Sequence, residues 1–136
     1  MTKQNTIAVV TSLVLLLITL AFARRLEDHQ QVVELFAVVL TIIGSVYIGF
    51  ALKDLDWKHQ VTEISAAGIF ILAAVFGLWW DPWLIAASLI IHGFWDLLHH
   101  RTQYTTDVPN GYIPFCAIYD WAAGGYFAID LVTDAV

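Results

Sequence analysis

Long apolar runs recur along the chain, separated by short polar segments. Three predicted helices, at about residues 6–23, 33–52 and 63–80, each carry at most one charged residue, which lies at the helix start. An α-helix rises about 1.5 Å per residue, so roughly 20 apolar residues cross the hydrocarbon core of a bilayer. The pattern therefore predicts three membrane-spanning helices in the first 80 residues.

Two further apolar runs are interrupted by ionisable residues. The run at about 83–100 contains His92 and Asp96, and the run at about 113–133 contains Asp120. Both runs are predicted to be helices that span the membrane, because lipid offers no hydrogen-bond partner and the backbone at that depth must form its hydrogen bonds within the chain. The sequence thus predicts an all-α fold: one transmembrane bundle of about five helices with short loops, covering residues 1–136.

Composition excludes the main alternatives to a membrane protein. Hydrophobic residues make up 60% of the chain and charged residues 13%, with a mean hydropathy of +0.74, too apolar for one soluble core of this size. An aromatic content of 14% excludes intrinsic disorder. The net charge of -6, without a basic cluster, indicates that nucleic acid is not a partner. We expect membrane lipids as partners, with a homo-oligomer or a partner membrane subunit left open.

Basic residues predict the orientation in the membrane. On the amino-terminal side of a five-span bundle lie Lys3, Lys53, Lys58 and Arg101, whereas Arg24 and Arg25 lie on the other side. The positive-inside tendency then favours a cytoplasmic amino terminus. The first helix is predicted to be retained rather than cleaved as a signal peptide, because its positive pair follows the apolar stretch.

The strongest chemical signal is a polar stripe on the fourth predicted helix. His92, Asp96 and His99 have i, i+4, i+7 spacing and lie within about 60° of one another at 100° per residue. A charged side chain at membrane depth costs at least a few kcal/mol, so such groups normally face the bundle interior and a partner. We therefore expect these side chains to point inward.

Asp120 is expected at the same membrane depth as His92 or Asp96, because the loop between the fourth and fifth helices makes the fifth helix enter from the side of the membrane where the fourth one ends. Two carboxylates there would repel unless they share a proton or a histidine or cation lies between them. Imidazole and carboxylate suit zinc or iron. The sequence predicts a divalent transition metal held by His92, Asp96, His99 and Asp120, with Asp96 or His100 as the general base. A hydrogen-bonded brace between two helices is the structural alternative.

Other residues carry weaker signals. Glu34 and Glu63 are interpreted as helix caps. Glu63 lies on the same side of the membrane as His99, and either Glu63 or the nearby His59 is retained as a candidate ligand from the third helix. Cys116, one turn before Asp120, is interpreted as a small apolar filler. Small residues around Gly77 and at Gly124-Gly125 predict close helix packing.

Two resemblances follow from these motifs. The pairing of His92-Gly-Phe-Trp-Asp96-Leu-Leu-His99-His100 with Cys116-Ala-Ile-Tyr-Asp120-Trp resembles a family of small bacterial integral membrane proteins of unknown function. Ser88-Leu-Ile-Ile-His92 together with Asp120 is similar in outline to the zinc site of seven-helix membrane hydrolases, which include the alkaline ceramidases. This chain has about five predicted spans and lacks the separate His-x-x-x-His helix of those hydrolases.

Three functions are consistent with the sequence. The first is a metal-dependent membrane enzyme that acts on a lipid or another amphiphile. The second is a proton or small-solute pathway along His99, Asp96, His92 and Asp120. The third is a non-catalytic accessory subunit of a membrane complex. No haem is expected, because only His92 lies deep and a second axial histidine at equal depth is missing.

Overall fold

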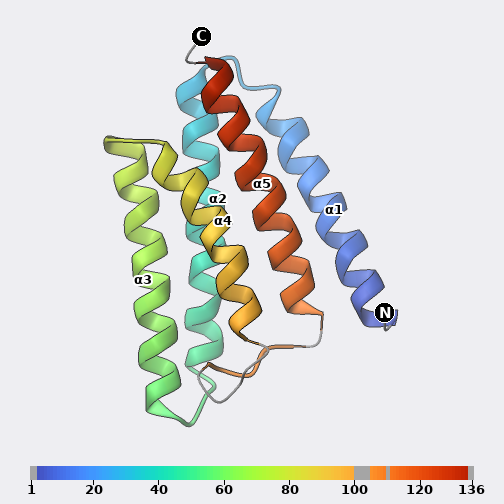
Figure 1. The fold of residues 1–136 in the computed structure, drawn as a ribbon, viewed down its shortest axis with the longest axis vertical. Coiled ribbons are helices and arrows are strands. Elements are labelled where there is room, and N and C mark those ends of the chain that lie inside the picture. The colour runs from blue at the N-terminus through green and yellow to red at the C-terminus, as the bar shows by residue number, and fades with distance from the viewer. Residues whose placement is uncertain (1–2, 100–104, 110, 135–136) are drawn as a thin grey trace.

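The structure, a computed structural model, describes residues 3–99, 105–109 and 111–134, and within them the only regular elements are five α-helices. In chain order they are α1 (Lys3–Ala23), α2 (His29–Ala51), α3 (Trp57–Trp79), α4 (Trp83–Leu98) and α5 (Tyr112–Asp134). Consecutive helices run in opposite directions, so the two chain ends lie at opposite ends of the bundle (Figure 1). The predicted all-α bundle of five helices is confirmed.

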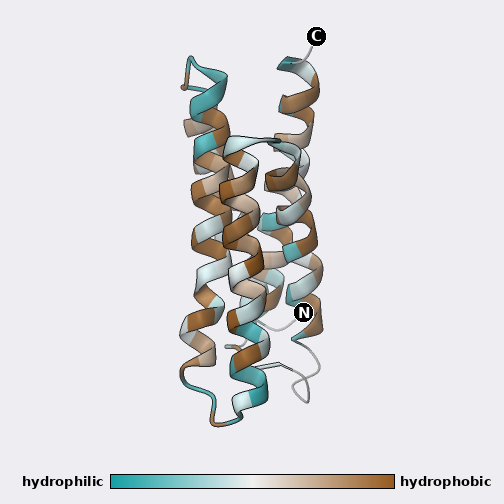
Figure 2. Ribbon diagram, turned by 90° about the vertical axis from the view of Figure 1, so that its left-hand side faces the viewer, coloured by the Kyte–Doolittle hydropathy of each residue, from teal (hydrophilic) through white to brown (hydrophobic). Residues whose placement is uncertain are grey.

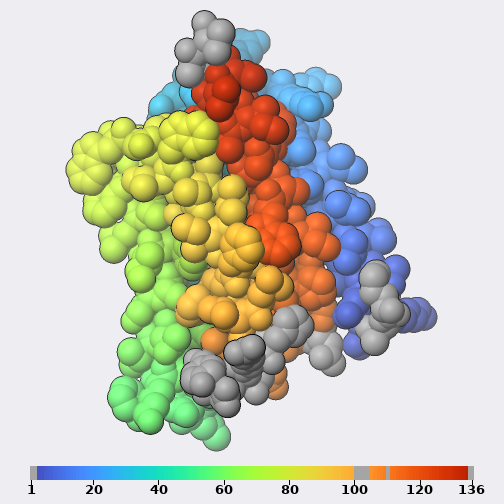
Figure 3. All heavy atoms as spheres, in the orientation of Figure 1, coloured from blue at the N-terminus to red at the C-terminus, as the bar shows by residue number. Residues whose placement is uncertain are grey.

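The arrangement places α4 and α5 at the centre. In the view of Figure 1, α3 lies on one side of α4 and α1 on the far side of α5, with α2 behind them. The space-filling view of the same face shows α4 and α5 in close contact and covering most of α2 (Figure 3). Side chains from α2, α4 and α5 therefore meet inside the bundle.

The outer surface is suited to lipid. Helices α1, α2 and α3 are long and apolar enough to cross a membrane. Large hydrophobic side chains more than half exposed occur on all five helices, for example Leu17, Ile42, Ile69, Ile91 and Ile129. Hydrophobic positions run along the length of the helices, whereas hydrophilic ones gather mainly near their ends (Figure 2). Such an apolar exterior is characteristic of a protein whose solvent is the bilayer.

Helices α2 and α3 begin at least four residues earlier than predicted. The Asp28 carboxylate accepts a hydrogen bond from the backbone N–H of Gln30 at 3.0 Å, and Asp56 accepts one from Lys58 N–H at 2.9 Å. These N-caps start α2 at His29 rather than near residue 33, and α3 at Trp57 rather than near residue 63. The interpretation of Glu34 and Glu63 as caps is therefore wrong.

Helix α4 is shorter than predicted. It ends at Leu98 rather than near residue 100, and His99 forms its C-cap with helical backbone angles. At its other end, the Asp81 carboxylate accepts a hydrogen bond from the backbone N–H of Trp83 at 3.0 Å in the tight turn between α3 and α4. The polar stripe of α4 thus lies in its last two turns.

Glycines allow α4 to approach its neighbours. A Cβ on Gly124 of α5 would lie 2.9 Å from Ile90 Cγ1 and 3.1 Å from the carbonyl oxygen of Ala86, both on α4. A Cβ on Gly77 of α3 would collide with the side chain of Ile85. Close packing by small residues is confirmed at these two positions, whereas Gly125 faces open space.

This packing gives a direct stability test. We expect Gly124→Ala to destabilise the bundle by about 1–3 kcal/mol, because the backbone of α4 would have to move away. Gly125→Ala is the matched control on the same helix, and we expect it to be neutral or stabilising by up to about 1 kcal/mol. Reversible unfolding of both variants in mixed micelles measures the difference, and equal stabilities would refute the packing argument.

The two halves of the bundle interior differ in polarity. Near the amino end of α4, the core is apolar, with Phe36 stacked on Phe127 at 4.6 Å between ring centroids. The buried histidine and carboxyl side chains of the described residues instead lie toward the α2–α3 connection; they are Glu63, His92, Asp96, His99 and Asp120. The candidate site is therefore confined to one half of the bundle.

Candidate metal centre

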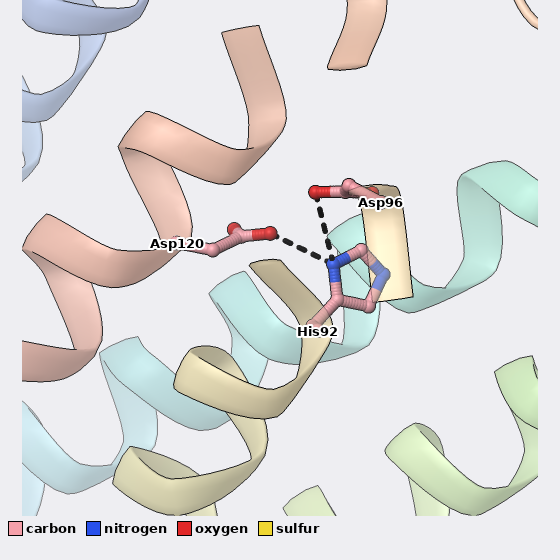
Figure 4. A group of neighbouring side chains, drawn as sticks. All are labelled: His92, Asp96 and Asp120. Carbon is pink, nitrogen blue, oxygen red and sulfur yellow. Dashed lines mark hydrogen bonds and ion pairs between the residues drawn. The ribbon is translucent and has the colours of Figure 1, made fainter. Parts of the chain in front are cut away.

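Three predicted site residues meet inside the bundle. His92 and Asp96 lie one turn apart on α4, and Asp120 approaches from α5 (Figure 4). The distance from His92 Nδ1 to Asp120 Oδ2 is 2.7 Å, and that to Asp96 Oδ2 is 3.8 Å. All three side chains are 0% exposed, and one ligand atom from each lies within 4.8 Å of the others. We call this group the triad.

Tyr47 of α2 joins the triad from a third helix. Its hydroxyl donates a hydrogen bond to Asp96 Oδ1. The Tyr47 ring lies between two histidines, with centroid distances of 5.5 Å to His92 and 4.4 Å to His99. Sequence reasoning missed this residue. Its position along α2 could have identified it, because the helical spacing places Tyr47 on the same buried face as Phe36 and Leu40.

His99, the fourth predicted metal ligand, pairs with Glu63 instead of joining the triad. Its Nε2 lies 2.9 Å from Glu63 Oε1 of α3, and its Nδ1–H donates to the carbonyl oxygen of Trp95 at 3.2 Å. The backbone N–H of Thr106 donates to the same Glu63 oxygen at 3.2 Å. His99 therefore links α4 to α3 and to the segment before α5, and the structure does not place it among the triad atoms.

The Glu63–His99 pair must share a proton. Because the carbonyl of Trp95 only accepts, Nδ1 of His99 carries a hydrogen, and a second proton is required between Nε2 and the carboxyl oxygen. The pair is then either imidazolium with carboxylate or neutral imidazole with carboxylic acid. In both forms the two side chains are 0% exposed, and among the described residues no hydrogen-bond partner is found for the second carboxyl oxygen, Glu63 Oε2.

The remaining predicted candidates lie elsewhere. Cys116 is buried on α5 but does not belong to the triad. His59 lies at the end of the bundle, where its Nδ1 is 3.0 Å from Asp54 Oδ2. The hydrogen bond from the backbone N–H of Asp56 holds the pKa of Asp54 below its ordinary value; desolvation opposes this shift, and His59 adds a further lowering. His100 lies outside the described residues.

The triad has more acceptors than protein donors can satisfy. Both carboxylates face Nδ1 of His92, which carries at most one hydrogen. Among the described residues, no hydrogen-bond partner is found for Asp96 Oδ2, Asp120 Oδ1 or His92 Nε2. Two buried carboxylates in this position require bound protons or a cation, because an uncompensated charge at zero exposure is strongly unfavourable.

The donor set fits a divalent transition metal. Bonds of about 2.0–2.2 Å from a tetrahedral metal place its ligand atoms about 3.3 Å apart. The two distances from His92 Nδ1, 2.7 and 3.8 Å, lie on either side of that value, so small side-chain shifts would open the site to a metal ion. A neutral imidazole and two carboxylates would balance the charge of a divalent ion, and three protein ligands leave a coordination position for water or substrate.

Comparison of the chain with protein-family models, with curated proteins and with solved structures gave no match.

Proposed function

We propose that this chain is an integral membrane protein with a metal site at the triad. The observation that carries the proposal is the convergence of His92, Asp96 and Asp120, at zero exposure, with ligand atoms within 4.8 Å. Ionisable residues at membrane depth are expensive, and a functional site is the default interpretation. Zinc and iron both suit this set of nitrogen and oxygen ligands.

The location that we propose is the bacterial inner membrane, with a cytoplasmic amino terminus. Lys3 begins α1, and at the same end of the bundle Lys53 lies in the α2–α3 connection and Lys58 in the first turn of α3; Arg101 lies outside the described residues. Arg24 and Arg25 lie at the opposite end. This distribution supports a cytoplasmic location for the end nearer the triad.

The activity that we propose is metal-dependent chemistry on a lipid or another amphiphile. A metal in the triad would lower the pKa of a bound water and so supply a nucleophile at neutral pH. Asp96, whose Oδ1 accepts a hydrogen bond from the Tyr47 hydroxyl, would be the base that accepts a proton from such a water. His100, which follows the C-cap of α4, is retained as an alternative base.

A proton pathway is supported less well by the geometry. The residues of the predicted pathway all lie in one half of the bundle; they are His99, Asp96, His92 and Asp120. The Tyr47 ring lies between the two histidines. Beyond Asp120, no buried ionisable side chain of the described residues continues toward the carboxyl end of α5. The series ends in the middle of the bundle, as expected for a binding site rather than a complete path.

A role as an accessory subunit would use the same metal site without catalysis.

The two sequence resemblances remain predictions. The likeness to small bacterial membrane proteins of unknown function covers the same residues that form the triad but implies no activity. The likeness to the ceramidase-type hydrolases is consistent with a site formed by His92 and Asp120, although Ser88 is not among the triad residues.

Elemental analysis of the purified protein tests the proposal. We expect about one equivalent of zinc or iron per chain after expression in metal-supplemented medium, because a buried three-ligand site binds a metal tightly at neutral pH. X-ray absorption at the edge of that metal should report nitrogen and oxygen ligands without sulfur, since Cys116 is outside the triad. A protein without stoichiometric metal, or with a sulfur ligand, would overturn this assignment.

A further inference from the structure

A lateral cavity reaches the triad from the outer surface of the bundle. Its volume is about 260 Å³, and its apolar wall includes Leu15 of α1, Val39 and Ile42 of α2, and Phe115 of α5. Leu15 and Ile42 are 42% and 59% exposed, so the cavity opens outward between α1 and α2. Asp120 forms part of its inner wall. The cavity thus connects the lipid-facing surface with a member of the triad.

The polar edge of this cavity offers hydrogen-bond acceptors. Thr19 and Tyr119 line it together with Asp120. The Thr19 hydroxyl donates to the carbonyl oxygen of Leu15 at 3.0 Å, so it accepts from the Tyr119 hydroxyl at 2.8 Å. Both hydroxyl hydrogens are therefore used, whereas the buried Asp120 Oδ1 has no partner among the described residues. A ligand that pairs with Asp120 Oδ1 would therefore need to bring its own O–H or N–H group.

We propose that the cavity binds a single-chain amphiphile whose polar end carries a hydrogen-bond donor, either a hydroxyl or an amine. The alkyl chain lies against Val39, Ile42 and Phe115, and the donor bonds to Asp120 Oδ1 beside the triad. This inference deepens the proposed function, on which it rests, by naming the substrate class and its path from the bilayer. Burial of the apolar chain supplies affinity, and the unpaired carboxylate oxygen supplies specificity.

Photoaffinity labelling in lipid nanodiscs tests the inference. The probe is a long-chain primary alcohol with a diazirine in its alkyl chain, and the comparison probe is its methyl ether, which lacks the donor. We expect the alcohol to crosslink to residues of the cavity wall at Leu15, Val39, Ile42 or Phe115. The ether should label them about tenfold less, because it leaves the buried acceptor unpaired. An excess of unlabelled long-chain alcohol or long-chain amine should suppress the labelling.

Two neighbouring substitutions provide a matched pair. Val39→Phe fills the cavity and should abolish the localised crosslinks, whereas Val38→Phe adds the same side chain at a position 55% exposed to lipid and should preserve them. Crosslinks scattered over the outer surface, equal labelling by alcohol and ether, or equal labelling of the two variants would overturn the inference.

Metal content of the same samples separates this inference from the proposed function. Localised crosslinks in a protein without bound metal would reject the metal site and retain the cavity as an amphiphile site. Bound metal with scattered crosslinks would retain the metal site and reject the cavity.

Discussion

Asp120→Asn is expected to remove stoichiometric metal from the protein. The substitution replaces an anionic ligand by a neutral amide of the same size, so the triad loses one of two charges that balance a divalent ion. His92→Ala removes the nitrogen that faces both carboxylates and should have the same effect. Elemental analysis of each purified variant, normalised to protein concentration, measures the change.

The same helix supplies a matched control. Asp130 lies on α5 near its carboxyl end, where its Oδ2 is 3.5 Å from His29 Nδ1, far along the helix from the triad. Asp130→Asn should therefore bind metal as the unmodified protein does. Tyr47→Phe should give an intermediate result, with affinity about 10–100-fold lower, because it removes a hydrogen bond to a ligand rather than a ligand. Retention of full metal content by Asp120→Asn would contradict the site.

His99→Leu is expected to lower the free energy of unfolding by about 3–5 kcal/mol. Glu63 would lose its histidine partner at 2.9 Å and keep only the Thr106 N–H on the same oxygen. Because the Glu63 side chain is 0% exposed, its carboxyl group would then be buried with too few partners. Unfolding by sodium dodecyl sulfate in mixed micelles, followed by circular dichroism, measures the loss.

Two further variants separate loss of the pair from loss of packing. The double variant Glu63→Met with His99→Leu should recover most of the stability, since an apolar replacement of a whole buried pair is often neutral. His59→Leu removes another histidine–carboxylate contact, but at a partly exposed position, and should cost no more than about 1 kcal/mol. A double variant as unstable as His99→Leu alone would indicate that the pair contributes through side-chain shape rather than hydrogen bonding.

Helix number and the core of the site followed from the sequence. Five apolar runs predict five helices, because the hydrogen bonds of a helix are local and each run approaches the length that a bilayer-spanning helix requires. The spacing of His92 and Asp96 places both on one helix face by geometry alone. Asp120 could be matched to their depth because a short connection returns the chain at the same end of the bundle. The structure confirms that these three side chains meet.

The helix starts were less predictable. Asp28 and Asp56 begin α2 and α3 through side-chain hydrogen bonds to backbone N–H groups, and both lie before the apolar runs. Hydropathy reports where lipid contact begins, whereas a helix begins where its first N–H groups are capped. Because α3 begins six residues before Glu63, this residue lies within the helix and is buried, rather than at the helix start as predicted.

Partner choice between helices was decided only by the tertiary structure. His99 has the spacing of a fourth ligand, yet α3 offers it Glu63 at hydrogen-bond distance, and Tyr47 of α2 takes the place beside Asp96. The sequence by itself determined which side chains face inward on each helix, because the inward face depends only on the order of residues along that helix. Which of these side chains touch each other depends on the rotation of neighbouring helices and the distance between them. Both are set by contacts between residues far apart in the sequence, such as those of Gly124 with Ala86 and Ile90.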